Sequence, residues 1–275
     1  FAFLVLVSVV IFWIRRNVIR LNRFWKNEMK GWPKLDADLI LYFEIVLMSL
    51  FLTMNGADLY IQTNFPTAEH YLKAGSFPVS QYLIPLFEGM ALDSVILIER
   101  AAWWMHIIGI FIFLNYLYYS KHLHILLAFP NTFFANLQAK GGFANNPTVT
   151  AEVKLMMDPE SDPYAAPDVS ADEPDKFGAS DVMDLNRVQL LNAYTCTECG
   201  RCTSECPANQ TGKLLSPRKI MMDTRDRLTE VGDNISKNKG VFVPDGKQLL
   251  NNYITAEELW ACTSCNACVE TCPID

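Results

Sequence analysis

Three long apolar runs dominate the first half of the chain and predict membrane-spanning helices. They lie at about residues 1–14, 38–55 and 95–120. The second and third are close to the ~20 residues needed to cross the hydrocarbon core of a bilayer. The first would rise only ~21 Å, short of the ~30 Å core. We therefore expect residues 1–14 to be the end of a span that begins upstream.

Charged residues between these runs predict the orientation of the spans. The segment 15–34 carries seven basic residues and one acid, whereas the loop 56–92 carries a single basic residue, Lys73. The positive-inside rule places the basic segment in the cytoplasm. The second span then leaves the cytoplasm, the third returns, and the chain after about residue 120 is cytoplasmic. The chain is expected to be a multi-pass protein of the inner (cytoplasmic) membrane, with membrane lipid as a partner.

One carboxylate interrupts the second run. Glu44 lies among apolar residues, where a charged side chain is costly and is expected to face other helices or a cavity. Two interpretations stay open: a neutral, hydrogen-bonded residue near the interface, or a role with protons or a quinone.

Beyond about residue 138 the pattern becomes polar. Residues 144–185 hold ten acids, two bases and several acid–proline pairs, a composition that favours an extended, solvated linker over 138–185. The chain is thus predicted to contain a transmembrane helical domain (1–137), this linker, and a second folded domain (186–275). The net charge divides in the same way, +2 for residues 1–143 and −9 for 144–275. Such a balance excludes the broad basic surface of a nucleic-acid binder.

Short helices are predicted inside the second domain. Thr255 and Glu258 form a capping box that opens one of them. Ser216 and Pro217 suit the first positions of a longer helix, which is expected to run to about Val231 and to end at Gly232. Four basic residues on this helix indicate either a solvated face or a docking face: Arg218, Lys219, Arg225 and Arg227.

The cysteines carry the strongest chemical signal. All eight lie after residue 195, in two motifs with the same Cys-x2-Cys-x2-Cys-x3-Cys-Pro spacing that is typical of two-cluster ferredoxins. In that pattern the fourth cysteine of each motif binds the other cluster. One 4Fe–4S cluster is then expected on Cys196, Cys199, Cys202 and Cys272, and the other on Cys262, Cys265, Cys268 and Cys206. Zinc sites favour separated Cys-x2-Cys pairs, and disulfides are rare in a reducing cytoplasm, so both are weaker alternatives.

Histidines at the third span suggest a second cofactor. His106 and His124 are 18 residues apart, which places them on one face of a continuous helix with a rise of ~27 Å between them, whereas His122 points to the opposite side. This spacing suits one axial ligand for each of two b-type haems. Packing or interfacial roles for the histidines remain the alternative, because the second ligand of each haem would have to come from elsewhere.

Two stretches resemble known families. Residues 102–130, with His106, His124 and Pro130, resemble the last span of the nitrate reductase gamma type of cytochrome b domain. The cysteine-rich half, with Ser216-Pro217-Arg218 after the first motif, resembles the iron–sulfur subunits of heterodisulfide reductase and anaerobic glycerol-3-phosphate dehydrogenase. The whole is similar to a membrane-bound iron–sulfur oxidoreductase, and the resemblance implies that His106 and His124 bind haem. It also implies that the chain is a fragment that lacks an earlier haem-binding helix and the segments after the second motif.

The sequence thus predicts a mainly α-helical protein, a transmembrane helical bundle followed by an α-helical, ferredoxin-like domain with two 4Fe–4S clusters. The expected function is electron transfer between membrane quinone, through b-type haem, and a cytoplasmic dehydrogenase or reductase subunit, with the redox chemistry supplied by the cofactors. No nucleic acid partner is expected. Two alternatives stay open: a haem-free membrane anchor that carries a ferredoxin module, and an iron–sulfur redox sensor.

Overall fold

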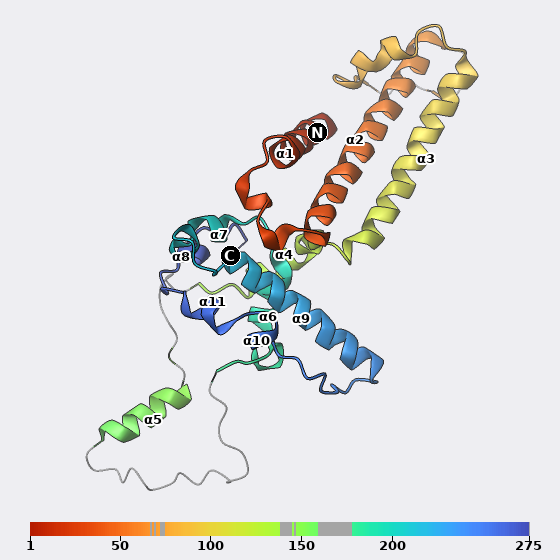
Figure 1. Ribbon diagram of the computed structural model, residues 1–275. Coiled ribbons are helices and arrows are strands. Elements are labelled where there is room, and N and C mark those ends of the chain that lie inside the picture. Colours follow the sequence, from red (N-terminus) through yellow and green to blue (C-terminus); the bar gives the residue numbers. More distant parts are fainter. Residues whose placement is uncertain are drawn as a thin grey trace. The chain divides into compact units, whose positions relative to one another are not determined.

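A computed structural model shows a helical protein that divides into two units (Figure 1). The first unit contains residues 1–126 and 197–199, and the second contains 127–196 and 200–275. The structure describes residues 1–66, 68, 70–71, 75–137, 145, 147–158 and 178–274. Within these ranges the chain forms no strand, only a single bridge between Leu250 and Ile254.

Three helices build the first unit: α1 (Ala2–Asn17), α2 (Trp32–Asn64) and α3 (Leu92–Leu117). Helices α2 and α3 pack side by side, and α1 packs on α2 (Figure 1). By length and composition, α2 and α3 are apolar enough to cross a membrane. Helix α1 has 16 residues.

Helix α2 is longer than the predicted span of residues 38–55, because Gly56 does not end it. A Cβ atom added at Gly56 would lie 3.0 Å from the Leu83 Cβ atom and 3.2 Å from the Ser80 carbonyl oxygen. The glycine, in the middle of α2, therefore allows the segment around Ser80 and Leu83 to pack closely against the helix. Pro33, in the first turn, suits the start of the helix, since its missing N–H group would have no helical partner there.

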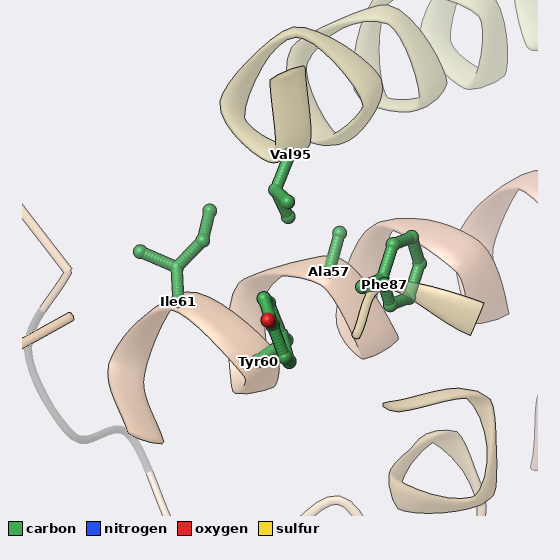
Figure 2. Packing of buried hydrophobic residues seen from close by; sticks show 5 residues of the cluster. All are labelled: Ala57, Tyr60, Ile61, Phe87 and Val95. Atoms are coloured by element: carbon green, nitrogen blue, oxygen red, sulfur yellow. The ribbon is translucent and has the colours of Figure 1, made fainter. Parts of the chain in front are cut away.

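A small apolar core lies where α2 and α3 meet the loop between them (Figure 2). It contains Ala57, Tyr60 and Ile61 of α2, Val95 of α3, and Phe87, which follows the short 3-10 helix η3 (Ser80–Leu86). The segment around residues 82–90 thus buries Phe87 while Tyr82 and Leu86 stay exposed.

The third span ends earlier than predicted, and this overturns one argument about the histidines. Helix α3 stops at Leu117, and a turn and the 3-10 helix η4 (Lys121–Leu123) separate it from α4 (His124–Phe133). The Ser120 hydroxyl accepts a 3.1 Å hydrogen bond from the His122 backbone N–H, which starts the new turn. No continuous helix links His106 to His124, so the inference that they share one helical face is wrong.

Short helices make up most of the second unit. They are α5 (Pro147–Met157), η5 (Val182–Asp184), α6 (Arg187–Thr195), α7 (Arg201–Glu205), α8 (Pro207–Gln210), α9 (Pro217–Lys237), α10 (Leu249–Asn252), α11 (Ala256–Trp260) and α12 (Ala267–Glu270). Helices α6 and α7 pack on α9, and α7 packs on α12. Helix α5 shows that part of the predicted linker is helical rather than extended. Much of the remaining linker, including residues 159–177, lies outside the described residues.

The helix starts are predicted correctly, but one helix end is not. The Ser216 side chain caps α9 and the Thr255–Glu258 capping box opens α11, as expected. Helix α9, however, continues through Gly232. It ends where Lys239 adopts a left-handed φ of 56° and Gly240 N–H donates to the Ile235 carbonyl at 2.9 Å, the geometry of a Schellman motif.

Two of the four basic residues on α9 are buried, which contradicts both the solvated-face and the docking-face interpretation for them. Arg218 and Arg227 have no exposed surface. The Arg227 guanidinium donates to both carboxylate oxygens of Asp181, to both of Asp245, and to the Lys247 carbonyl. This network ties α9 to two loops of the second unit.

Candidate iron–sulfur and membrane cofactor sites

The two cysteine motifs adopt the same backbone conformation. We call residues 196–202 the first loop and residues 262–268 the second loop. Left-handed φ angles occur at Glu198 (55°) and Gly200 (73°) in the first loop, and at the equivalent Ser264 (54°) and Asn266 (58°) in the second. A short helix begins at the sixth residue of each loop, α7 at Arg201 and α12 at Ala267. Left-handed residues alternating with right-handed ones turn successive N–H groups toward one side, a geometry that binds anions and many iron–sulfur clusters.

Backbone N–H groups of the second loop reach the cysteine sulfurs. Ser264 N–H donates to Cys262 Sγ at 3.4 Å. Hydrogen bonds from the Ala267 backbone N–H and from Thr263 lower the pKa of the Cys265 thiol. Both effects favour the thiolate, which is the form that binds metal. No disulfide joins the eight cysteines, all of which lie in the described part of the chain.

The fourth cysteine of the first motif lies near the second loop. Burial raises the pKa of the Cys268 thiol, and negative charge on Cys262 and Cys206 raises it further. Cys206 is itself buried and precedes Pro207, the first residue of α8. Three thiols, from Cys206, Cys262 and Cys268, are therefore close enough to interact electrostatically.

The spacing of the ligands matters for the kind of centre. Among the described residues, no three side chains of His, Cys, Asp or Glu converge as a single metal ion would require. A single tetrahedral zinc ion needs its sulfurs within ~2.3 Å of one point. A 4Fe–4S cube is bound at its corners, so its thiolates stand further apart. The donor set and the repeated loop backbone fit the cube.

The two candidate haem ligands share one feature. His106 Nδ1 lies 2.9 Å from the Leu47 carbonyl oxygen of α2, and His124 Nδ1 lies 3.0 Å from the Lys121 carbonyl oxygen. A histidine whose Nδ1 donates to a backbone carbonyl keeps Nε2 for a metal, and this arrangement is usual for metal-binding histidines. Both imidazoles are half-buried. Their Nδ1 contacts and their burial fit a role in haem binding.

Close packing of α3 on α2 makes the contact between His106 and the Leu47 carbonyl possible. A Cβ atom added at Gly109 would lie 2.8 Å from Leu47 Cδ2. The glycine thus lets α3 approach α2 one turn from His106. The Phe51 ring, 5.6 Å from the His106 ring between centroids, packs on the same side.

The third histidine of the region differs from these two. His122 donates through its backbone N–H to Ser120, and its ring lies 5.4 Å from Phe113 and 5.6 Å from His124 between centroids. Burial lowers the pKa of His122, as does the neighbouring His124. Glu44 is half-buried on α2.

Sequence analysis missed a group of buried charges in the first unit. Lys121 Nζ pairs with the carboxylate of Glu198 and lies 3.9 Å from Asp36 Oδ2. Asp36 also accepts hydrogen bonds from the Tyr116 hydroxyl at 2.5 Å and from the Lys121 backbone N–H at 3.1 Å. At the start of α2, Arg16 pairs with Asp38 at 3.1 Å. The available signal was weak, because acids just before an apolar run also occur as ordinary interfacial residues.

Known proteins that resemble this chain support the iron–sulfur part of the prediction. Residues 195–275 match the 4Fe-4S dicluster domain family. A probable iron-sulfur-binding oxidoreductase, FadF, of Bacillus subtilis is 29% identical over 99% of this chain and 38% of its own length. An EtfAB:quinone oxidoreductase of Syntrophomonas wolfei is 26% identical over 99% of this chain and 37% of its own length. A probable membrane-anchored ferredoxin of Chromohalobacter salexigens is 33% identical over 38% of this chain and 17% of its own length.

The chain thus spans less than two-fifths of the length of these relatives, and no solved structure matches it. The similarity of the cysteine-rich half to heterodisulfide reductase is confirmed by matches to CoB-CoM heterodisulfide reductase subunits of two Methanosarcina species. The resemblance of the membrane half to nitrate reductase gamma is not tested by these relatives and stays a prediction. Together, the dicluster domain and the relatives show an iron–sulfur oxidoreductase-like chain, and the two apolar helices favour its association with a membrane.

Proposed function

We propose that this chain transfers electrons between a membrane quinone and a cytoplasmic redox partner through two 4Fe–4S clusters. The observation that carries the proposal is the repeated loop backbone. Two motifs that are 66 residues apart place left-handed residues at the same two positions and begin a helix at the same point. Each loop offers three thiols and a set of N–H groups to one cluster.

The clusters are proposed to take their fourth ligands from the opposite motif. Cys196, Cys199, Cys202 and Cys272 would hold the first cluster, and Cys262, Cys265, Cys268 and Cys206 the second. The electrostatic coupling of Cys206 to Cys262 and Cys268 supports the ligand set of the second cluster. The packing of α7 on α12, the helices that follow the two motifs' first cysteines, supports an exchange of ligands between the motifs. When bound, the clusters supply one-electron redox chemistry, while the loops set their potentials through N–H···S hydrogen bonds and burial.

We also propose b-type haem in the membrane half, which His106 and His124 would help to hold. Their Nδ1 contacts to backbone carbonyls orient the two rings and leave Nε2 for the iron. The contribution of this chain is to fix the tautomer and ring angle of each ligand, and the remaining ligands would come from other helices. A quinone as the membrane substrate is supported by the name of the Syntrophomonas relative.

The orientation follows from charge, as does the choice of a cytoplasmic partner. The basic segment 15–34 lies before α2 and in its first turn, so the positive-inside rule supports cytoplasmic ends for the start of α2 and the end of α3. A dehydrogenase or reductase subunit in the cytoplasm would then exchange electrons with the clusters.

Anaerobic purification of the full-length membrane protein tests these assignments. About eight irons and eight acid-labile sulfides per chain are expected for two cubane clusters, and the reduced-minus-oxidised spectrum should contain a b-type haem band. Material with zinc in place of iron would refute the electron-transfer proposal. Full iron without a haem band would leave an iron–sulfur module on a haem-free anchor.

The crossed ligand assignment has its own test. Replacing Cys206 by Ser should damage the cluster of the second loop and leave the electron paramagnetic resonance (EPR) signal of the first, whereas Cys272→Ser should do the reverse. If Cys206→Ser instead removes the first-loop signal, the crossed assignment is wrong.

A further inference from the structure

Lys121 is buried beside two carboxylates, whose negative charge it balances. Its side chain is 8% exposed, and Nζ donates to the Pro33 carbonyl oxygen at 2.7 Å and to the Glu198 carboxylate. Asp36 Oδ2 lies at 3.9 Å. The side chains of Glu198 and Asp36 are 2% and 3% exposed. Buried ions are stable only when they are paired and hydrogen-bonded, so this lysine holds two carboxylates that water does not reach.

One of these carboxylates belongs to a cysteine loop. Glu198 stands between Cys196 and Cys199 in the first loop, and residues 197–199 are part of the first unit. Its left-handed φ of 55° is one of the two that shape the loop. The ion pair with Lys121 therefore fixes the residue directly before Cys199.

The backbone of the same lysine contacts a candidate haem ligand. The Lys121 carbonyl oxygen lies 3.0 Å from His124 Nδ1. One residue thus orients His124 through its main chain and holds the first loop through its side chain. The second loop differs in its environment, since Cys262 and Cys265 are exposed, whereas the three cysteines of the first loop are half-buried.

We propose that Lys121 is a positioning residue that makes the first cluster the one that exchanges electrons with the membrane side. The second cluster then serves the soluble partner. This inference rests on the proposed function, with a membrane quinol or quinone as the electron donor or acceptor. Oxidation of one quinol to quinone breaks two O–H bonds and releases two electrons and two protons. The electrons pass one at a time toward the soluble partner, and the protons leave to water. Reduction of a quinone is the reverse.

Charge-removing variants of the ion pair test the assignment in the full-length membrane protein. Lys121→Met and Glu198→Gln should each slow the reduction of the first cluster by quinol, measured by rapid-freeze EPR. The loss should be severalfold, because the rate of electron transfer falls as the distance between donor and acceptor increases. The iron content should stay at about eight per chain, as two cubane clusters require.

Redox potentials separate positioning from general loosening of the fold. Lys121→Met removes a positive charge and should lower the midpoint potential of the first cluster, whereas Glu198→Gln removes a negative charge and should raise it. The double variant should return the potential toward the wild-type value but remain slow. Lys121→Arg, which keeps the charge, should retain most of the rate. Lys30→Met is the matched control, since it removes an exposed lysine of the same unit and should change neither quantity.

Three results would overturn the inference: wild-type reduction rates in both single variants, a potential shift confined to the second cluster, or a shift in the same direction for both variants. If Lys121→Met does not accumulate, Glu198→Gln and Lys121→Arg still decide the question. Failure of the proposed function would look different, because the wild-type protein itself would then lack the clusters or would not react with quinol.

Discussion

Replacement of Arg227 by Met should destabilise the second unit strongly. The guanidinium is fully buried and makes hydrogen bonds of 2.5–3.1 Å to Asp181 and Asp245 and of 2.8 Å to the Lys247 carbonyl. Methionine would fill the apolar part of the space but would leave two carboxylates facing each other without a counter-charge.

The size of the effect follows from these contacts. Removal of one partner of a buried ion pair usually costs about 3–5 kcal/mol. Asp181 and Asp245 retain 13% and 24% exposure, so water can solvate part of their charge. Asp181 also keeps hydrogen bonds from the Val182 and Leu249 N–H groups. We therefore expect a loss near ~3 kcal/mol, which lowers the melting temperature of a domain of this size by roughly 12–24 °C.

Thermal loss of the cluster absorbance in the full-length, anaerobically purified protein measures this change. Arg225→Met is the matched control, because Arg225 lies on the same helix and pairs with Asp226 at 3.1 Å, the two side chains being 18% and 57% exposed. An ion pair with one partner in water contributes about 0–1 kcal/mol, so the control should lose much less stability than Arg227→Met. Equal melting temperatures for the two variants would refute the view that the Arg227 network holds α9 in place.

Three further predictions concern the membrane half and the acid response. Gly109→Leu should separate α2 from α3 and break the contact of His106 with α2, and the haem band should weaken while the iron–sulfur EPR signals stay, whereas an unchanged band would contradict the packing argument. His106→Ala should remove one haem signal from the difference spectrum and His122→Ala none, and the opposite pattern would reassign the ligand. Hydrogen bonds from the arginine network lower the pKa of Asp245 to about 2, so its stabilising effect is complete above the unfolded pKa of ~3.9 and is lost as the pH falls toward 2. Since the Asp245 carboxylate is partly exposed, we expect it to contribute only ~1 kcal/mol to the free energy of unfolding. Urea unfolding at pH 6 and pH 3.5 should therefore show a smaller loss of stability on acidification in Asp245→Asn than in wild type.

The features that the sequence predicted well are local ones. The cysteine spacing fixes the number and type of ligands whatever surrounds them, and the matching dicluster family confirms the iron–sulfur part. The caps at Ser216 and Thr255 depend on atoms within three or four residues, and they form as expected.

The features that it missed depend on distant contacts. Gly56 and Gly232 resemble helix ends in the sequence, but neighbouring packing at the first, and a left-handed Lys239 beyond the second, decide where the helices end. Arg227 resembles a surface residue because its partners, Asp181 and Asp245, are 46 and 18 residues away. The break after Leu117 depends on Asp36, 85 residues from Lys121, and no periodicity in the third span could reveal it.

The coupling of Cys206 to the thiols of the second loop has a consequence for biogenesis. Under the crossed assignment, neither cubane can be completed until both halves of the second unit have been synthesised and have met, because each half donates one sulfur to its counterpart. Maturation should then be an all-or-none event late in translation. Each motif also supplies ligands to both clusters. Peroxide that oxidises a cysteine of one motif should therefore disturb the loop that holds the other cluster as well, so oxidative damage to one cluster should spread to its neighbour.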